Sequence, residues 1–282
     1  MKPAVSVIIP YYHGNRFLPG LLEMMRSNAE NLRNETGSGL EVLIINDSPD
    51  ETIEIDEQPY TLKILTNPKN SGIHATRANG LKTAEGEYIL FLDQDDRITN
   101  NCLVSQLRHI GKHDFVVGNG YDDEPGGGQH LIFSGRKQQL CSTDLKCHYY
   151  YNNLIRSPGQ VLIRKASIPA YWSEQILNNN GSDDAFLWIL MLCEGAKGTI
   201  NEDVVFEHVF TGQNTSGDNS GMLNSQREVA EKLNGIASPL GMRAFLRRAE
   251  YYCQPGKFQK YRYWDVGLRR KVYSARHMSE RN

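Results

Sequence analysis

The side chains best suited to chemistry in this sequence are acids that follow an apolar run. Residues 85–96 (EGEYILFLDQDD) end in Asp93, Asp95 and Asp96. Carboxylates this close repel one another unless a cation lies between them. A hard cation such as Mn²⁺ or Mg²⁺, bridging to the oxygens of a diphosphate, fits that need. The alternative is an acidic turn in which Asp96 or Thr99 caps the following helix.

A second acidic pair, Asp183 and Asp184, lies in the segment GSDDAFLW. It opens an amphipathic helix predicted over residues 184–193. A carboxylate here is able to take a proton from an attacking hydroxyl group. The alternative is that the two acids cap this helix. The two interpretations are compatible, because a base at a helix N-terminus is rigidly placed.

Elements that alternate between strand and helix must position these acids. The strands are predicted at 4–10, 41–45, 61–65 and 87–92, and the helices between them at 17–32 and 74–84. This alternation favours a parallel sheet with helices on both faces. Ligands bind such sheets at the carboxyl ends of the strands. Because each predicted strand is followed by polar residues, we expect these residues to converge on one crevice.

The second half of the chain is less regular. Residues 119–130, with one proline and several glycines, predict a long loop. Strands are expected at 159–164 and 204–208, and helices at 226–233 and 239–252. The apolar runs are too short to span a bilayer, which needs ~20 residues. The five scattered cysteines fit reduced thiols better than a disulfide framework, and this indicates a cytoplasmic protein.

Four segments, taken in order, resemble family 2 glycosyltransferases. They are SVIIPYY, EVLIINDS, the stretch from NSGIHATRANG to LFLDQDD, and GSDDAFLW. The resemblance implies an α/β fold of the GT-A type, a Rossmann-like nucleotide-binding sheet with helices on both faces, plus a C-terminal helical extension. The catalytic domain would cover 1–235, with a nucleotide-binding half at 1–98 and an acceptor half at 99–235. The extension would cover 236–282.

The resemblance also implies a nucleotide-sugar site. Pro10 and Tyr12 match the edge of the nucleotide pocket, where an aromatic ring stacks on a base. Asp47 matches the acid that reads the uracil or ribose, and the alternative is an aspartate that forms a turn. Gly72 belongs to the same site. Arg77 matches a residue near the nucleotide or its phosphates, and the alternative is an arginine on a helix surface.

The segment Asp93-Gln94-Asp95 matches the DXD motif that holds ribose, metal and diphosphate. The implied cofactor is Mn²⁺ or Mg²⁺, with Asp93, Asp95 and His208 as its ligands. For His208, a role as a core or surface histidine is an equally good interpretation. Asp184 takes the position of the catalytic base, and Asp183 replaces a glutamate that supports it. The implied reaction transfers a hexose from a nucleotide donor to a glycan, with inversion at the anomeric carbon. The expected donor is UDP-linked.

The C-terminal segment is strongly basic, although the whole chain carries a net charge of only −2. Residues 241–282 contain eleven Lys or Arg against three acids. Within residues 257–277 a helical apolar stripe is predicted at Tyr261, Trp264, Leu268 and Val272. One interpretation is that this helix lies on the anionic surface at the inner face of a membrane. The other is that it packs onto the domain or onto a partner chain. The acidic remainder argues against nucleic acid as a partner.

The donor and acceptor therefore follow from the resemblance alone: a nucleotide sugar, and a glycan or lipid-linked glycan of a bacterial surface polysaccharide. Two other functions remain open. One is a nucleotidyltransferase or phosphatase on a related α/β sheet, which would act at phosphorus without needing Asp184. The other is a non-catalytic protein that binds nucleotides or glycans and would keep its affinity without Asp184.

Overall fold

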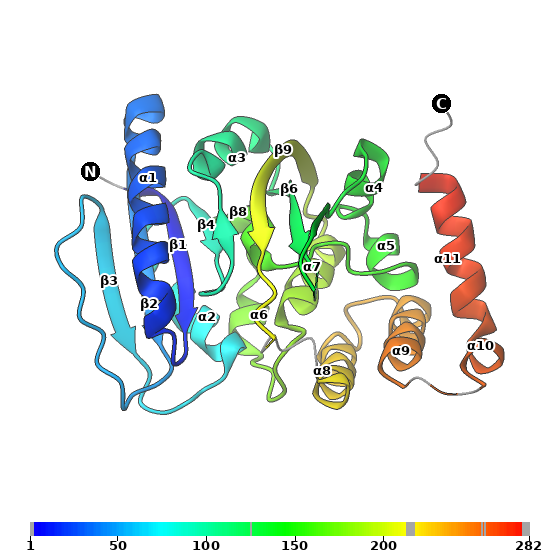
Figure 1. Cartoon of the computed structure of the whole chain (residues 1–282). Helices are drawn as coiled ribbons and strands as arrows, with labels where there is room; N and C mark the ends of the chain where they lie inside the picture. Colours follow the sequence, from blue (N-terminus) through cyan, green and yellow to red (C-terminus); the bar gives the residue numbers. More distant parts are fainter. Residues whose placement is uncertain (1–2, 125, 213–217, 255, 257, 278–282) are drawn as a thin grey trace.

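The computed structural model describes residues 3–124, 126–212, 218–254, 256 and 258–277. These residues form one sheet, in the order β3-β2-β1-β4-β8-β6-β9-β5, with β7 paired to β6. Figure 1 shows this sheet running from β3 on one side towards the C-terminal helices on the other. The chain is therefore built around a single sheet, and the predicted α/β class is confirmed.

The first four long strands are parallel, as the alternating pattern predicts. They are β1 (Pro3–Tyr11), β2 (Gly39–Asn46), β3 (Thr61–Thr66) and β4 (Tyr88–Phe91). β1 lies between β2 and β4, and β3 pairs with the outer edge of β2. Since all four strands run in one direction, their carboxyl ends, and the polar residues after them, lie along the same edge of the sheet.

The second half of the sheet is mixed. It consists of β5 (Arg97–Ile98), β6 (Phe115–Asp123), β7 (Gln129–Leu131), β8 (Val161–Arg164) and β9 (Gly198–His208). β8 runs antiparallel to both β4 and β6, whereas β6 and β9 are parallel. The long loop predicted at 119–130 is wrong, because β6 extends to Asp123 and forms an antiparallel hairpin with β7.

The glycines at 126–128 do lie between β6 and β7 and have positive φ, so the predicted loop is too long rather than misplaced. The glycines inside β6 have a different role. A Cβ atom on Gly118 would lie 2.2 Å from Cγ2 of Val205, and one on Gly120 would lie 2.5 Å from the backbone oxygen of Phe206. The two glycines thus allow β9 to approach β6 closely, a recognised use of glycine within strands.

Helices cover both faces of the sheet. On one face, Val7 and Ile9 of β1 pack in a core with α1 (Leu18–Thr36) and α3 (Cys102–Ile110). On the other face, Ile8 belongs to a core that includes residues of α2 (Ile73–Thr83), α6 (Ala170–Glu174) and α7 (Asp183–Cys193). Short helices complete the first 212 residues: η1 (Asn15–Phe17), α4 (Arg136–Cys141), α5 (Leu145–Tyr150), η2 (Pro158–Gln160) and η3 (Lys165–Ser167).

The C-terminal helices α8 (Asn219–Lys232) and α9 (Pro239–Cys253) join the second core. Met242 and Phe245 of α9 are buried in it, together with Ala237 just before the helix. The boundary at 235/236 stays a prediction, but α9 packs as part of the body that carries the sheet. In Figure 1, α9 lies beyond the β6 side of the sheet (orange).

The last helices, α10 (Gln259–Arg262) and α11 (Trp264–His277), continue the chain beyond α9. They attach through Tyr263 and Val266, which are buried, and through an ion pair between Asp265 and Arg247 of α9 at 2.7 Å. Lys257, the first residue of the predicted basic segment, lies outside the described residues. Within the described part of the chain, no helix combines the length and the apolar character needed to cross a membrane.

The predicted apolar stripe of this segment is exposed rather than packed. Trp264 is 66% exposed, Leu268 53% and Val272 40%, and Tyr261 is 81% exposed. α11 therefore packs onto α9 through the opposite side of the helix. The predicted stripe is turned away from the protein.

Candidate functional site

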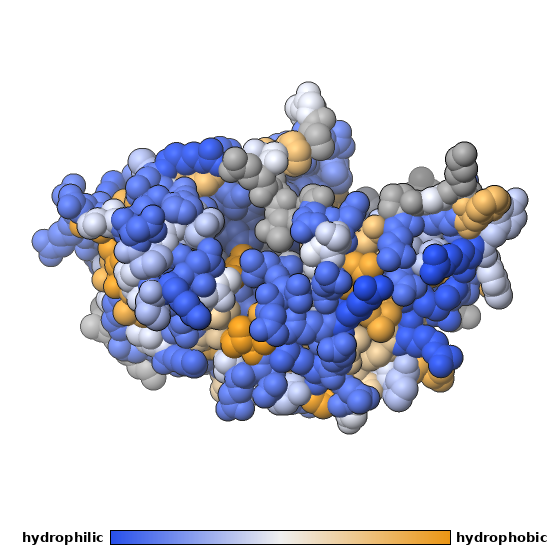
Figure 2. All heavy atoms as spheres, turned by 90° about the horizontal axis from the view of Figure 1, so that it is seen from below, coloured by the Kyte–Doolittle hydropathy of each residue, from blue (hydrophilic) through white to orange (hydrophobic). Residues whose placement is uncertain are grey.

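A cavity of about 980 Å³ opens at the carboxyl ends of the parallel strands. Figure 2 views the molecule from this side, where hydrophilic side chains predominate and apolar ones form small separate patches. The structure places every site residue predicted from the sequence on the wall of this cavity. They are Pro10, Tyr12, Asp47, Gly72, Arg77, Asp93, Gln94, Asp95, Asp183, Asp184 and His208.

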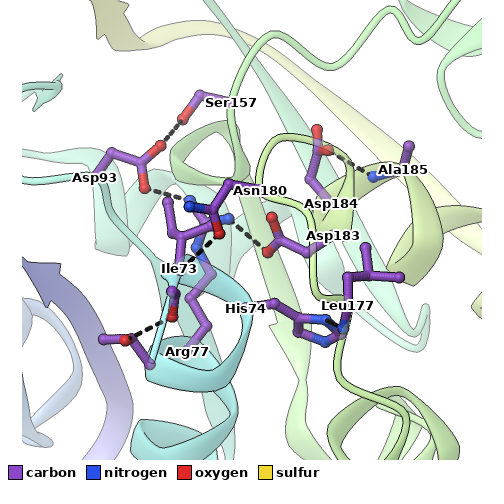
Figure 3. Close-up of polar contacts among 12 residues, drawn as sticks. Ile73, His74, Arg77, Asp93, Ser157, Leu177, Asn180, Asp183, Asp184 and Ala185 are labelled. Carbon is purple, nitrogen blue, oxygen red and sulfur yellow. Dashed lines mark hydrogen bonds and ion pairs between the residues drawn. The ribbon is translucent and has the colours of Figure 1, made fainter. Parts of the chain in front are cut away.

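Arg77 joins two of the predicted acids. Its Nη2 forms a short ion pair with Asp93 after β4, and its Nη1 lies 2.6 Å from Oδ2 of Asp183 at the start of α7. Figure 3 shows the three side chains meeting from three different elements. Burial alone would lower the pKa of Arg77, but the two carboxylates outweigh it and raise the pKa. The alternative of a surface arginine is wrong, because Arg77 is 3% exposed.

Buried side chains fix the position of this bridge. Nδ1 of His74 accepts from the backbone of Leu177 at 3.0 Å, and Nε2 bonds the carbonyl oxygen of Trp172. The indole of Trp172 donates to the carbonyl oxygen of Asp183 at 2.9 Å. The side-chain oxygen of Asn180 accepts from the first backbone N–H of α2 at 3.3 Å. Together these contacts hold α2, which carries Arg77, against the segment that leads into α7.

Asp184, the second residue of α7, accepts from Nδ2 of Asn153 at 3.0 Å and from the backbone of Ala185 at 2.7 Å. Burial, with repulsion from Asp183, raises the pKa of Asp184 to about 7. A carboxylate with this pKa is well matched to accept a proton near neutral pH. Capping of α7 does not account for Asp183 and Asp184, because the N-cap residue is Ser182 and the carboxylate of Asp183 binds Arg77.

Asp47 organises the loop after β3. Its Oδ1 accepts from Asn67 at 2.7 Å and from the backbone of Ser71 at 2.8 Å, and its Oδ2 accepts from the backbone of Gly72 at 3.0 Å. The turn at Ser48 is instead formed by Asn46, whose Oδ1 accepts from the backbone of Ser48. The turn-forming alternative for Asp47 is therefore wrong.

Gln94 ties the end of β1 to the end of β4. Its side-chain oxygen accepts from the backbone N–H of Tyr12 at 2.9 Å, and its side-chain nitrogen donates to the carbonyl oxygen of Tyr12 at 2.9 Å. Gly14 leaves room for this amide, because a Cβ there would lie 2.2 Å from the Gln94 oxygen. Gln94 thus fixes the distance between two predicted parts of the donor site. The ring of Tyr12 is half exposed at the rim.

The predicted metal ligands Asp93, Asp95 and His208 all line the cavity. Burial and the neighbouring Asp93 both raise the pKa of Asp95, and His208 interacts with it electrostatically. Nδ1 of His208 lies 2.9 Å from Oδ1 of Asp122, an arrangement that commonly orients a metal-binding histidine. Asp93 already uses one oxygen for Arg77. Asp95 and His208 therefore fit a cation best. Oδ2 of Asp93, which accepts from the hydroxyl of Ser157 at 3.5 Å, is a third candidate.

The protein groups do not form a complete cage for a cation. Among the residues that the structure describes, no three His, Cys, Asp or Glu side chains are close enough to hold a metal by themselves. A cation here would need oxygens from a bound diphosphate, as is common for Mg²⁺-type sites. Oδ2 of the buried Asp96 also has no hydrogen-bond partner within the described ranges. Asp96 caps no helix, because the N-cap of α3 is Asn101.

Sequence reasoning missed part of the cavity. Asn153 and Asp122 contact two predicted site residues, but neither belongs to a recognisable motif. One whole end of the cavity is formed by α8 and α9, with Met222, Gln226, Phe245, Arg248 and Tyr252. The sequence predicts helices, a basic charge and an apolar stripe in the C-terminal region, but no part of the site. The local sequence holds no signal that α9 folds back onto the site.

Comparison with known proteins identifies the family. The model of "Glycosyl transferase family 2" matches residues 6–172, more than half of the chain. An uncharacterized glycosyltransferase of Haemophilus influenzae is 33% identical over 124 residues, 42% of this chain and 46% of that protein. Putative glycosyltransferase EpsH of Bacillus subtilis is 32% identical over 123 residues, 42% of this chain and 33% of that protein. The matches thus span less than half of these relatives.

Solved structures share the fold at low identity. S. aureus TarS 1–349 in complex with UDP-GlcNAc has a TM-score of 0.61 at 16% identity, covering 94% of this chain and 78% of that chain. The mannosyltransferase PcManGT from Pyrobaculum calidifontis, in complex with GDP-Man and Mn²⁺, has a TM-score of 0.53 at 13% identity, covering 98% and 76%. The GT-A fold expected from the resemblance is confirmed.

Proposed function

Because this chain belongs to glycosyl transferase family 2, we propose that it transfers a hexose from a UDP-sugar to a hydroxyl group of a surface-polysaccharide acceptor. One observation carries the proposal: Asp184, with a pKa raised to about 7, lies on the wall of a cavity that also contains Asp93 and Asp95. A base and a site for a charged leaving group are the two requirements of this reaction. The bound donors in the TarS and PcManGT structures support a nucleotide sugar as substrate.

In the proposed reaction, Asp184 takes the proton of the acceptor hydroxyl while the oxygen attacks the anomeric carbon. Attack from the face opposite to the departing diphosphate inverts that carbon. Asn153 and the backbone of Ala185 orient the carboxylate of Asp184. Asp183 supports the site through Arg77, to which it is bonded.

The donor would lie along the edge formed by β1, β2 and β4. Tyr12 would stack on the base, and Pro10 would line the pocket beside it. Both oxygens of Asp47 already hold the loop that contains Gly72, so we propose that this loop and the carboxylate read the nucleoside together. Arg77 and Asp93 would lie near the ribose and phosphates.

A divalent cation, Mn²⁺ or Mg²⁺, neutralises the charge that develops on the leaving diphosphate when it is bound. Asp95 and His208 would hold it, and Asp93 would contribute its remaining oxygen. Asp122 keeps the other ring nitrogen of His208 occupied, which leaves Nε2 for the metal.

The first experiment is a panel of UDP-sugars assayed for released UDP with and without Mn²⁺. We expect Asp95→Ala to lose turnover and weaken donor binding, and Asp184→Asn to lose turnover while donor binding is kept. Asp50→Asn is the matched control, since Asp50 is an exposed aspartate outside the cavity. Full activity in Asp184→Asn would remove the proposed base.

The same panel separates the two other functions considered from the sequence. A non-catalytic binding protein would retain UDP-sugars without releasing UDP in the wild type. A phosphatase or nucleotidyltransferase would release phosphate or exchange a nucleotide, independently of Asp184. If no UDP-sugar binds, GDP- and other nucleotide-linked sugars would be assayed next.

We also propose that the enzyme works in the cytoplasm at the inner face of the membrane, on a lipid-linked acceptor. Its five cysteines are all free, which suits a reducing compartment. The exposed stripe of Trp264, Leu268 and Val272 has Lys260 and Lys271 exposed nearby, the pattern of a helix that binds an anionic lipid surface.

Sedimentation with vesicles tests the membrane contact. The wild type should bind vesicles rich in phosphatidylglycerol and not vesicles of phosphatidylcholine alone. Trp264→Ala combined with Leu268→Ala should abolish binding, whereas Leu240→Ala, which removes an even more exposed leucine from α9, should not. Concentration-dependent dimerisation that the double variant abolishes would instead assign the stripe to a partner chain.

A further inference from the structure

The cavity has two chemically different ends. The end formed by the parallel strands is lined with acids, including Asp47, Asp93 and Asp95. The opposite end is lined by one side of α9, with Phe245, Arg248, Ala249, Tyr252 and Cys253. Asp184 is among the residues that line the same cavity. An acceptor that presents its hydroxyl to Asp184 would have the α9 end available for its next groups.

Arg248 is the unusual residue of that end. It is 5% exposed, yet it forms no ion pair with any acid in the part of the chain that the structure describes. One hydrogen bond is present, from Nη1 to the carbonyl oxygen of His148 at 2.6 Å. Burial lowers the pKa of Arg248 to about 10. The neighbours that oppose this shift are Cys147 and Tyr252, neither of which is a carboxylate.

The surroundings of Arg248 add no negative charge. Burial lowers the pKa of His148 to about 4, so its imidazole is neutral at pH 7. The guanidinium of Arg270 lies 5.5 Å from the centre of the Tyr252 ring. A second cation therefore lies beside Tyr252, which interacts electrostatically with Arg248. Arg156 lines the cavity as well, but it is paired with Asp122 at 3.1 Å.

A buried charge without a counter-charge is costly, and it is normally paired or coordinated. Two other arginines of the cavity wall, Arg77 and Arg156, have carboxylate partners within the protein. Arg248 has no such partner in the described part of the chain, and it lines the cavity. A guanidinium in this setting is well suited to a phosphate, because its planar donors bind two oxygens at once.

We propose that Arg248 is the centre of an anion subsite for a phosphate group of the acceptor. This inference rests on the proposed function, because only a transferase has an acceptor. It adds the chemical class of that acceptor. The phosphate has two possible sources. It is either the diphosphate that joins a glycan to its lipid or a phosphodiester within the growing polymer.

The binding test fills the donor site first. With UDP and Mn²⁺ at saturation, methyl phosphate is titrated into the full-length protein and its heat of binding is measured. We expect Arg248→Met to weaken methyl phosphate binding about ten-fold or more, as expected when a hydrogen bond to a charged group is lost. Arg248→Lys should retain part of the affinity. Arg243→Met, an exposed arginine on the same helix, is the matched control and should bind as the wild type does.

Equal affinity in the wild type and Arg248→Met would overturn the proposal, as would a wild type that does not bind methyl phosphate. The stability of each variant is measured in parallel, so that unfolding is not mistaken for lost binding. Replacing an unpaired buried cation by an apolar side chain of similar size should leave the free energy of unfolding unchanged or raised.

Two larger probes then distinguish the sources of the phosphate. One is a glycosyl diphosphate with a short alkyl chain, and the other is a disaccharide with an internal phosphodiester. The probe that loses more affinity in Arg248→Met names the source. Acceptor-free release of UDP is assayed separately: its absence in the wild type would overturn the proposed function, whereas the methyl phosphate result reports on the anion subsite alone.

Discussion

At the scale of single residues, Asp184 combines a catalytic demand with a cost in stability. Its pKa of about 7 in the folded protein lies above the ordinary value of 3.8. The protonated form therefore stabilises the folded state at low pH, and this contribution is lost as the pH rises through about 7. The ionised form, which the reaction needs, is the less stable one.

We expect Asp184→Asn to be more stable than the wild type above pH 7. A shift of this size corresponds to at most ~4 kcal/mol in the free energy of unfolding, with the gain growing between pH 4 and 7. Urea denaturation at pH 5 and pH 8 measures it. In the same range, kcat/KM of the wild type should rise with pH and level off above about 7. If the difference in the free energy of unfolding between Asp184→Asn and the wild type is the same at pH 5 and at pH 8, the raised pKa is contradicted.

Arg77 is a second residue whose importance depends on distant partners. Arg77→Met leaves Asp93 and Asp183 without their shared cation, and we expect a loss of ~3–5 kcal/mol in the free energy of unfolding. Arg26→Met, an exposed helix arginine paired with Glu23, should change it by less than ~1 kcal/mol. Denaturant titration compares the two. In Arg77→Met, adding Asp183→Asn should recover part of the loss, and a purely additive double variant would contradict the bridge.

At the scale of elements, the strand pair β6 and β9 depends on its glycines. Gly120→Ala would bring a Cβ within 2.5 Å of the backbone oxygen of Phe206, so the strands would have to separate. We expect a loss of ~1–3 kcal/mol in the free energy of unfolding. Gly20→Ala in α1 is the control: its Cβ meets nothing within 4 Å, and it should gain ~0.5–1 kcal/mol. Chemical denaturation measures the free energy of unfolding of both variants, and an unchanged value for Gly120→Ala would contradict the prediction.

The same elements show how far the sequence alone could go. Apolar runs and intervening helices predict β1 to β4 closely, because local pattern and parallel topology agree there. The motif positions then follow from strand ends, so all predicted site residues reach one cavity. The loop predicted at 119–130 overruns the last residues of β6, because the turn signal of the glycines at 126–128 is local whereas the pairing of β6 with β9 is long-range. The contacts of Arg77 with Asp183 and of Asp184 with Asn153 were out of reach, because long-range folding creates them.

At the scale of the whole molecule, the cavity requires both the sheet and the C-terminal helices. We expect a chain that ends at residue 253 to unfold cooperatively and to release UDP from the donor without acceptor. A chain that ends at residue 235 lacks Met242 and Phe245 of the core and should not fold cooperatively. Thermal unfolding and the UDP assay compare the two. A stable, active chain of 235 residues would instead establish the predicted boundary as a domain boundary.

The amide of Gln94 has one further consequence. By bonding both backbone groups of Tyr12, it acts as one more rung of the ladder between β1 and β4. Only two amino acids carry a side-chain amide that is donor and acceptor together, and asparagine is one methylene shorter. In a library that samples all amino acids at this position, selection for activity should therefore return glutamine almost alone. The middle position of the motif, which the motif leaves open to any residue, should thus tolerate little variation in this protein.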